Sequence, residues 1–362
     1  MILKFSFIKF ILIYFLIFGT IDFLFGNSIL NFLYEKNFIV NHDAQLKKIQ
    51  ENEKKYRIEN DYFHHTLKEN IISSAQWGPF KYKVCTDEYG FRDICKNKTK
   101  YEKNIFLIGD SFTEGIGLNY EKTFGGIMSA NWKINVKNLA VASYSPIIYK
   151  NKIKYYLNLG LSAEHVIVFL DISDIDDENN YFHCKENKSI CAKSDEKVES
   201  KLTEKKEEKK FPIFEKTKLA VKLLKREIFP KNNIYEKDFI RSSWTYSENN
   251  EIIVEGINRS LKNMDELYNY LNERNIPLSI VIYPWPGQIL HDKVNSKHVS
   301  IWKKFCEQKC ENFINLFPLF FDEINHNSKE KVIELFYLKN DVHFNEYAHK
   351  KIFEKINVFK FY

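Results

Sequence analysis

The segment Asn104-Ile-Phe-Leu-Ile-Gly-Asp-Ser-Phe-Thr-Glu-Gly115 decides the fold that this sequence predicts. It starts with an apolar run of the length of a buried strand, which Gly109 ends. Ser111 follows on a tight turn ahead of a helical pattern, where the first amides of the helix face any developing negative charge. The segment therefore predicts a strand, a turn and a helix, with an exposed serine at the turn.

Similar apolar runs recur along the chain and alternate with helical patterns. The further predicted strands are Ile134–Leu139, His165–Leu170, Ile276–Tyr283 and Phe313–Phe317, and the predicted helices span 120–131, 146–159, 257–274, 298–311 and 345–357. This alternation predicts a parallel α/β sheet covered by helices on both faces. In such folds the functional site lies beyond the carboxyl ends of the strands.

Polar residues of the kinds used in catalysis follow these strands and precede the last helix. Asn138 to Pro146 follows the second strand, Asp171-Ile-Ser-Asp174 follows the third, and Asn340-Asp-Val-His-Phe-Asn345 stands just before the last helix. An early serine with a late Asp and His suits nucleophilic catalysis, in which His takes the serine proton and the carboxylate stabilises the imidazolium.

These residues resemble a known family. The GDSFTEG segment at 109–115 and the DVHFN segment at 341–345 are similar to the SGNH/GDSL superfamily of serine esterases and acyltransferases. The resemblance covers residues 61–362 apart from a charged insertion, and Tyr62–Leu67 and Tyr89–Arg92 look like the lead-in of exported bacterial members. It implies a three-layer α/β/α, flavodoxin-like parallel sheet, the SGNH hydrolase fold.

The resemblance also implies roles for particular residues. Ser111 would be the nucleophile, His343 the base and Asp341 its orienter. The oxyanion hole would be formed by Ser111, by Ser143 where the family usually has Gly, and by Ser173 where the family has Asn. The common pattern has its Asp three residues before the His, at Asn340 here, but a subset of polysaccharide-modifying relatives has it two before, which matches Asp341.

Other residues admit two interpretations. Ser111 alone could be only a helix cap. Trp285, in Tyr283-Pro-Trp-Pro286, either stacks on a sugar in a substrate-binding role or packs under a loop. His64 and His65 have no partners at metal-ligand spacing, which favours local packing or hydrogen bonding. No metal and no cofactor are expected.

The N-terminus predicts a membrane anchor. Residues 1–26 contain an apolar span, Phe5–Phe25, with Lys4 and Lys9 near its N-terminal end, so the rest of the chain is expected on the outer side. A cleaved signal peptide is the alternative, but no small-x-small cleavage pattern follows the run. Residues 27–60 predict a polar stalk, and residues 185–210, with 16 charged positions of 26, predict a solvated insertion or disordered loop.

The six cysteines form three local couples, Cys85/Cys95, Cys184/Cys191 and Cys306/Cys310. Their spacings do not repeat a zinc pattern, and an exported domain favours disulfides. Local pairing is predicted from proximity, although six cysteines allow fifteen connectivities.

Composition excludes several classes of protein. The 362 residues are 44% hydrophobic and 28% charged, too apolar for a disordered chain. Lys plus Arg number 54 against 48 Asp plus Glu, and the two signs are interleaved, so no nucleic-acid partner is expected.

The sequence thus predicts a membrane-anchored, outward-facing SGNH-type enzyme. It would act on acyl esters, most plausibly acetyl esters, of cell-envelope carbohydrate through an acyl-Ser111 intermediate. Its expected partners are a carbohydrate or small ester substrate, the membrane and, for a transferase, a membrane acyl-donor protein. The alternatives are a non-catalytic glycan-binding or assembly subunit and, more weakly, a lipid esterase.

Overall fold

The computed structural model describes residues 51–95, 99–181, 241–248, 251–359 and 361, with isolated positions 17, 20, 22, 24, 25, 28, 32 and 221. Ile49–Lys197 and Ile234–Tyr362 form one compact unit, which holds all the elements described below. The other unit, Met1–Lys48 with Val198–Asn233, contains only isolated described residues.

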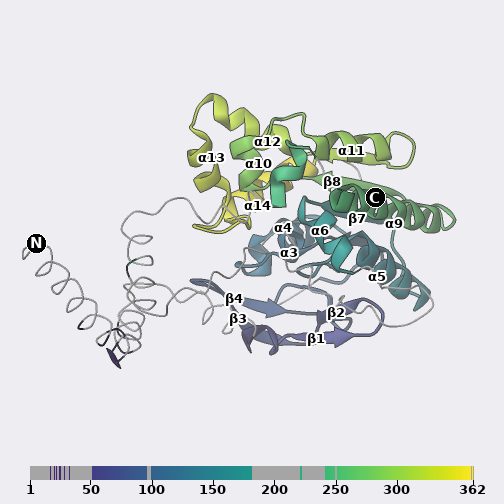
Figure 1. Ribbon diagram of the computed structural model, residues 1–362. Helices are drawn as coiled ribbons and strands as arrows, with labels where there is room; N and C mark the ends of the chain where they lie inside the picture. The colour runs from purple at the N-terminus through teal and green to yellow at the C-terminus, as the bar shows by residue number, and fades with distance from the viewer. Residues whose placement is uncertain are drawn as a thin grey trace, which may run out of the picture. The chain divides into compact units, whose positions relative to one another are not determined.

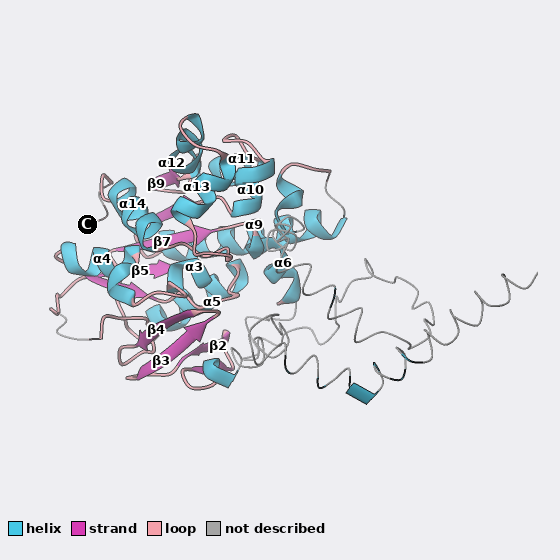
Figure 2. Cartoon of the chain, turned by 90° about the vertical axis from the view of Figure 1, so that its left-hand side faces the viewer, coloured by secondary structure: helices cyan, strands magenta, loops and turns pink. Residues whose placement is uncertain are grey.

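A parallel sheet of five strands forms the centre of the large unit, in the order β6-β5-β7-β8-β9. This is the order 2-1-3-4-5 of flavodoxin-like folds. The strands are β5 (Asn104–Ile108), β6 (Asn135–Asn138), β7 (His165–Leu170), β8 (Leu278–Ile282) and β9 (Asn312–Asn315). All five predicted strands are therefore confirmed, and Figure 2 shows them between the helices.

Helices cover both faces of this sheet (Figure 1). Successive strand residues point to opposite faces, so Phe106 and Ile108 of β5 belong to one hydrophobic core and Ile105 and Leu107 to another. The first core contains side chains of α5 (Pro146–Asn158), α9 (Glu251–Asn272) and α11 (Lys297–Cys306), and the second contains side chains of α4 (Phe124–Asn131), α10 (Pro286–His291), α13 (Lys329–Phe336) and α14 (Glu346–Ile356). The predicted three-layer α/β/α architecture is confirmed.

Short elements complete the connections. They are α3 (Ser111–Glu114), α6 (Ser173–Asn180) and α12 (Phe317–Phe321), with the 3-10 helices η1 (Tyr120–Lys122), η2 (Ser243–Thr245) and η3 (Asp322–Asn325). Both α3 and α6 begin just after sheet strands, so they place side chains at the carboxyl edge.

Two antiparallel hairpins precede the sheet and were not expected from the sequence. Strand β1 (Arg57–Asn60) pairs with β2 (His64–Leu67), and β3 (Ile72–Trp77) pairs with β4 (Phe80–Cys85). Tyr56 is 1% exposed and belongs to the first core. The predicted boundary of the stalk at residue 60 is therefore wrong, because its last residues are part of the folded unit.

Two of the three predicted cysteine couples form disulfides, Cys85–Cys95 and Cys306–Cys310, with Cα–Cα distances of 5.2 and 4.7 Å. Cys184 and Cys191 lie outside the described residues.

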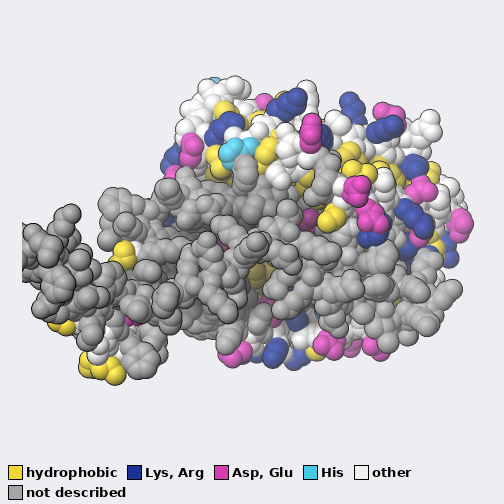
Figure 3. All heavy atoms as spheres, viewed as in Figure 1, with side chains coloured by type: hydrophobic (Ala, Val, Ile, Leu, Met, Phe, Trp, Pro, Cys, Tyr) yellow, Lys and Arg dark blue, Asp and Glu magenta, His cyan; other side chains and the backbone are white. Residues whose placement is uncertain are grey.

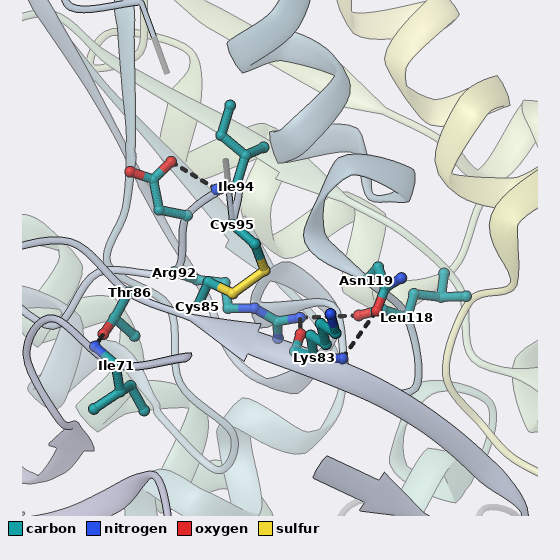
Figure 4. The surroundings of a disulfide bond; sticks show 10 residues. Ile71, Lys83, Cys85, Thr86, Arg92, Ile94, Cys95, Leu118 and Asn119 are labelled. Carbon is teal, nitrogen blue, oxygen red and sulfur yellow. Dashed lines mark hydrogen bonds between the residues drawn. A yellow bond between two sulfur atoms is a disulfide. The ribbon is translucent and has the colours of Figure 1, made fainter. Parts of the chain in front are cut away.

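Beside the first disulfide, the buried Arg92 donates to the carbonyls of Lys83 and Leu118, both at 2.9 Å (Figure 4). These hydrogen bonds connect β4, through Lys83, to the segment after α3, through Leu118.

No helix among the described residues is long and apolar enough to span a bilayer. The predicted anchor in residues 1–26 and the rest of the predicted stalk lie outside the described residues except for isolated positions, and the insertion 185–210 lies outside them completely. On the described surface seen in Figure 3, basic and acidic side chains are interleaved.

Candidate active site

The nucleophile candidate Ser111 lies directly after β5, as the first residue of α3. Asp110 caps this one-turn helix by accepting a hydrogen bond from the Phe112 N–H at 3.0 Å. Gly109 has no room for a side chain, since a Cβ there would lie 2.4 Å from Thr113 Oγ1. Gly115 ends the helix at a φ of 81°. The local sequence therefore holds Ser111 at the carboxyl edge of the sheet, where it is half-buried.

Ser111, His343 and Asp341 form a chain of hydrogen bonds. Ser111 Oγ lies 2.9 Å from His343 Nε2, and His343 Nδ1 lies 2.5 Å from Asp341 Oδ1. Residues two apart on a strand would point to opposite faces, but here the His343 N–H donates to Asp341 Oδ1 at 2.9 Å, so the chain turns between them. The left-handed φ of 61° at Asn340 precedes this turn. The structure thus brings the three predicted catalytic residues together.

A fourth residue, Trp77 of β3, completes this arrangement. Its Nε1–H donates to Asp341 Oδ2 at 2.8 Å, and its ring meets the His343 ring edge-on, with 5.2 Å between centroids. Phe112 packs on the same imidazole at 5.0 Å. Trp77 carried no sequence signal, because it lies 264 positions from Asp341 in a hairpin that the apolar pattern does not reveal.

The environment keeps Asp341 ionised. Burial alone would raise the pKa of its carboxyl, but the charge of His343 and hydrogen bonds from His343 and Trp77 outweigh burial and lower that pKa below its usual value. His343 is itself buried, with 6% of its side chain exposed. A charged carboxylate is therefore in place to stabilise an imidazolium that water reaches poorly.

A cluster of three acidic side chains lies next to Ser111. The sequence did not predict that these residues would lie together. Asp110, Asp171 and Asp174 are all nearly fully buried, and Tyr283 Oη lies 3.3 Å from Asp110 and 3.5 Å from Asp171. Burial, and then the charge of Asp171, raise the pKa of both Asp110 and Asp174 well above the usual value. Ser111 Oγ also lies 3.1 Å from Asp110 Oδ2.

The three predicted oxyanion residues have different surroundings. Within the described part of the chain, the backbone N–H groups of Ser111 and Ser143 have no hydrogen-bond partner. Ser143 has a φ of 63°, a left-handed conformation that glycine adopts without cost. The N–H of Ser173 is already donated to Asp171 Oδ1 at 2.6 Å. Ser173 can therefore contribute only its hydroxyl.

Trp285 does not offer an open surface to a sugar. Its side chain is 5% exposed, its Nε1–H donates to Asp171 Oδ2 at 2.9 Å, and the Arg241 guanidinium lies 5.5 Å from its ring centroid. The substrate-binding prediction for Trp285 is thus not supported, and the packing alternative agrees with these contacts. Among the described residues, no group of three or more His, Cys, Asp or Glu is arranged to hold a metal ion.

Comparison with known proteins gives remote similarities. No protein-family model matches the chain. It is 24% identical over 307 residues to the eukaryotic translation initiation factor 2-alpha kinase PK4 of Plasmodium berghei, which covers 75% of this chain and 11% of that protein. The chain therefore spans about a tenth of the length of that curated protein.

Three solved structures illustrate the structural similarities. The esterase EstA of Pseudoalteromonas sp. is 12% identical and covers 71% of this chain and 98% of its own, with a TM-score of 0.37. A lipolytic G-D-S-L protein of Veillonella parvula is 12% identical, covers 71% and 97%, and has a TM-score of 0.41. The acetylxylan esterase Axe2 of Geobacillus stearothermophilus, as a catalytic mutant, is 9% identical, covers 73% and 98%, and has a TM-score of 0.38. The strand order of the sheet and the meeting of Ser111, Asp341 and His343 at its carboxyl edge agree with the α/β architecture and the catalytic arrangement that the sequence predicts.

Proposed function

We propose that the protein is a serine esterase that cleaves acyl esters through an acyl-Ser111 intermediate. The observation that carries this proposal is the hydrogen-bonded chain from Ser111 Oγ through His343 to Asp341. A serine used only as a helix cap has no need of a base at 2.9 Å whose other nitrogen is held by a carboxylate.

In this mechanism Ser111 Oγ attacks the ester carbonyl while His343 Nε2 takes its proton. Asp341 stabilises the resulting imidazolium. The N–H groups of Ser111 and Ser143, which have no partner among the described residues, are available to the oxyanion. His343 then gives the proton to the departing alkoxide, which leaves an acyl-Ser111 ester. A water molecule, or a sugar hydroxyl in a transferase, attacks that ester with His343 again as the base.

The substrate class that we propose is an acetyl or similarly short acyl ester of cell-envelope carbohydrate. The support is the resemblance to polysaccharide-modifying relatives, including the Asp two residues before the His.

The proposal further includes an outward-facing location, anchored by Phe5–Phe25. The full-length protein should stay with membranes after carbonate extraction, whereas a soluble product that starts near residue 27 would contradict the anchor.

Labelling with a fluorophosphonate tests the reaction most directly. Wild-type protein should be labelled on Ser111 and should hydrolyse p-nitrophenyl acetate, and Ser111→Ala should lose the label and at least about 10³-fold in kcat with little change in melting temperature. Neither labelling nor turnover by folded wild-type protein would favour the glycan-binding alternative. Transfer to an added oligosaccharide in preference to water would identify an acyltransferase.

A further inference from the structure

The loop after β6 carries the oxyanion candidate Ser143, and a half-buried histidine, His65, contacts the peptide that bears its N–H. His65 Nε2 lies 2.8 Å from the carbonyl oxygen of Ala142. That carbonyl and the Ser143 N–H belong to the same peptide unit. The unit is trans, so the two groups point in opposite directions. Whatever holds the carbonyl therefore fixes the direction of the N–H.

The hydrogen-bond network determines the protonation of His65. A carbonyl oxygen only accepts, so His65 must carry a proton on Nε2. Burial, and then the charge of Arg57, lower the pKa of His65 to about 3, so the ring is neutral and its Nδ1 is an acceptor. His64 Nδ1 lies 2.7 Å from that atom and is the donor to it. His64 has a φ of 65°, a backbone conformation that is costly outside glycine.

Further contacts hold the same loop against the first hairpin. The Ala142 N–H donates to Glu114 Oε2 at 2.8 Å, and Arg57 of β1 binds both oxygens of Glu114, at 2.8 and 3.0 Å. The Tyr144 hydroxyl donates to the carbonyl of His65 at 2.5 Å. Both sides of Ser143 are thus tied to the β1–β2 hairpin, while its own N–H has no partner among the described residues.

The conformation of Ser143 explains why this peptide must be held, because its φ of 63° is left-handed. A left-handed conformation is unfavourable for any L-residue. Rotating the Ala142–Ser143 peptide would relieve Ser143, but it would replace the N–H at the oxyanion position by a carbonyl oxygen. The hydrogen bond from His65 opposes that rotation.

We infer that His65 is a positioning residue that keeps the Ser143 N–H available to the oxyanion by holding the Ala142 carbonyl. The inference rests on the proposed esterase function. It predicts a loss in kcat with little change in KM, since the interaction is made only when negative charge develops.

The test compares three variants for p-nitrophenyl acetate kinetics and melting temperature. His65→Leu, which removes the donor, should lower kcat by about 10²-fold, the scale of one lost oxyanion donor. His65→Gln, whose amide nitrogen can replace Nε2–H, should recover most of that loss. His165→Leu is the matched control, because His165 likewise makes one hydrogen bond through Nε2, to Ser279 Oγ at 2.8 Å, but lies at the opposite edge of the sheet.

A second measurement separates positioning from folding. Adding Ser143→Gly to His65→Leu removes the penalty on the left-handed conformation and should restore part of kcat without restoring the melting temperature to the same degree. If His65→Leu does not fold, His65→Asn, whose shorter amide cannot reach Ala142, takes its place. With an active wild type, equal kcat losses in the His65 variant and the His165 control would overturn the inference alone. A folded wild type that neither turns over nor labels would overturn the proposed function as well.

Discussion

Asp341→Asn is the sharpest test of the site because the structure shows what the change disrupts. Three N–H donors converge on this carboxylate: Nδ1–H and the backbone N–H of His343 on Oδ1, and Nε1–H of Trp77 on Oδ2. Asparagine has a single acceptor oxygen, so its NH₂ group must face one of these donors. If it faces His343, it donates to Nδ1, and the imidazole then carries its proton on Nε2, where it cannot accept the proton of Ser111.

The expected loss follows from that wrong tautomer. Asp341→Asn should lower kcat by about 10²–10⁴-fold, equivalent to about 3–5 kcal/mol, with a smaller effect on KM. Hydrolysis of p-nitrophenyl acetate measures both constants, and a melting curve shows whether the variant is folded.

Asn340→Gly is the matched control, because Asn340 is exposed, adjacent, and already in a left-handed conformation that glycine adopts freely. Its kcat should stay within about twofold of wild type, as expected for a surface change. A wild-type kcat in Asp341→Asn, or a larger loss in the Asn340 variant, would refute the assignment of Asp341 as the orienter.

Three further predictions concern the surroundings of the site and the fold. Trp77→Phe keeps a ring against His343 but removes the hydrogen bond to Asp341, which should lower kcat by about tenfold or more, and equal kcat in the two proteins would contradict the role of Trp77. Burial raises the pKa of Asp174, so the folded state keeps that proton when the unfolded chain has lost it, and stability falls as pH rises above about 4. Asp174→Asn should therefore reduce the decrease in melting temperature between pH 4.5 and 8. Replacing Cys85 and Cys95 by Ala opens a link between residues 10 apart, which should cost about 2–3 kcal/mol in urea unfolding, and an unchanged midpoint would argue against the disulfide in solution.

The sheet and the catalytic candidates could be predicted because their signals are local. A strand buried on both faces, such as β7, is a continuous apolar run, and Ser111 lies at the end of such a run. The hairpins gave no such signal. Strand β3 reads Ile-Ser-Ser-Ala-Gln-Trp, and its Ile72 is 72% exposed, so its residues do not alternate cleanly between apolar and polar.

The supporting contacts escaped prediction for a related reason. Trp77 with Asp341, and His65 with Ala142, are pairs separated by 264 and 77 positions, and no periodicity in the sequence connects them. The role of Trp285 was also open from the sequence, because a tryptophan after a strand packs or binds according to its neighbours. In this structure the Trp285 Nε1–H donates to Asp171, and the Arg241 guanidinium lies over the face of the Trp285 ring.

The distance along the chain between Trp77, Ser111 and the Asp341–His343 pair has a consequence for biosynthesis. Ser111 is synthesised 232 positions before His343, and Trp77 is synthesised 264 positions before Asp341. At ribosomal rates of about 5–20 residues per second, the nucleophile exists for on the order of ten seconds or more before the base that activates it. The nascent polypeptide therefore carries Ser111 without its partners for most of its synthesis, and the proposed active site forms only when the late-emerging segment docks onto structure made much earlier.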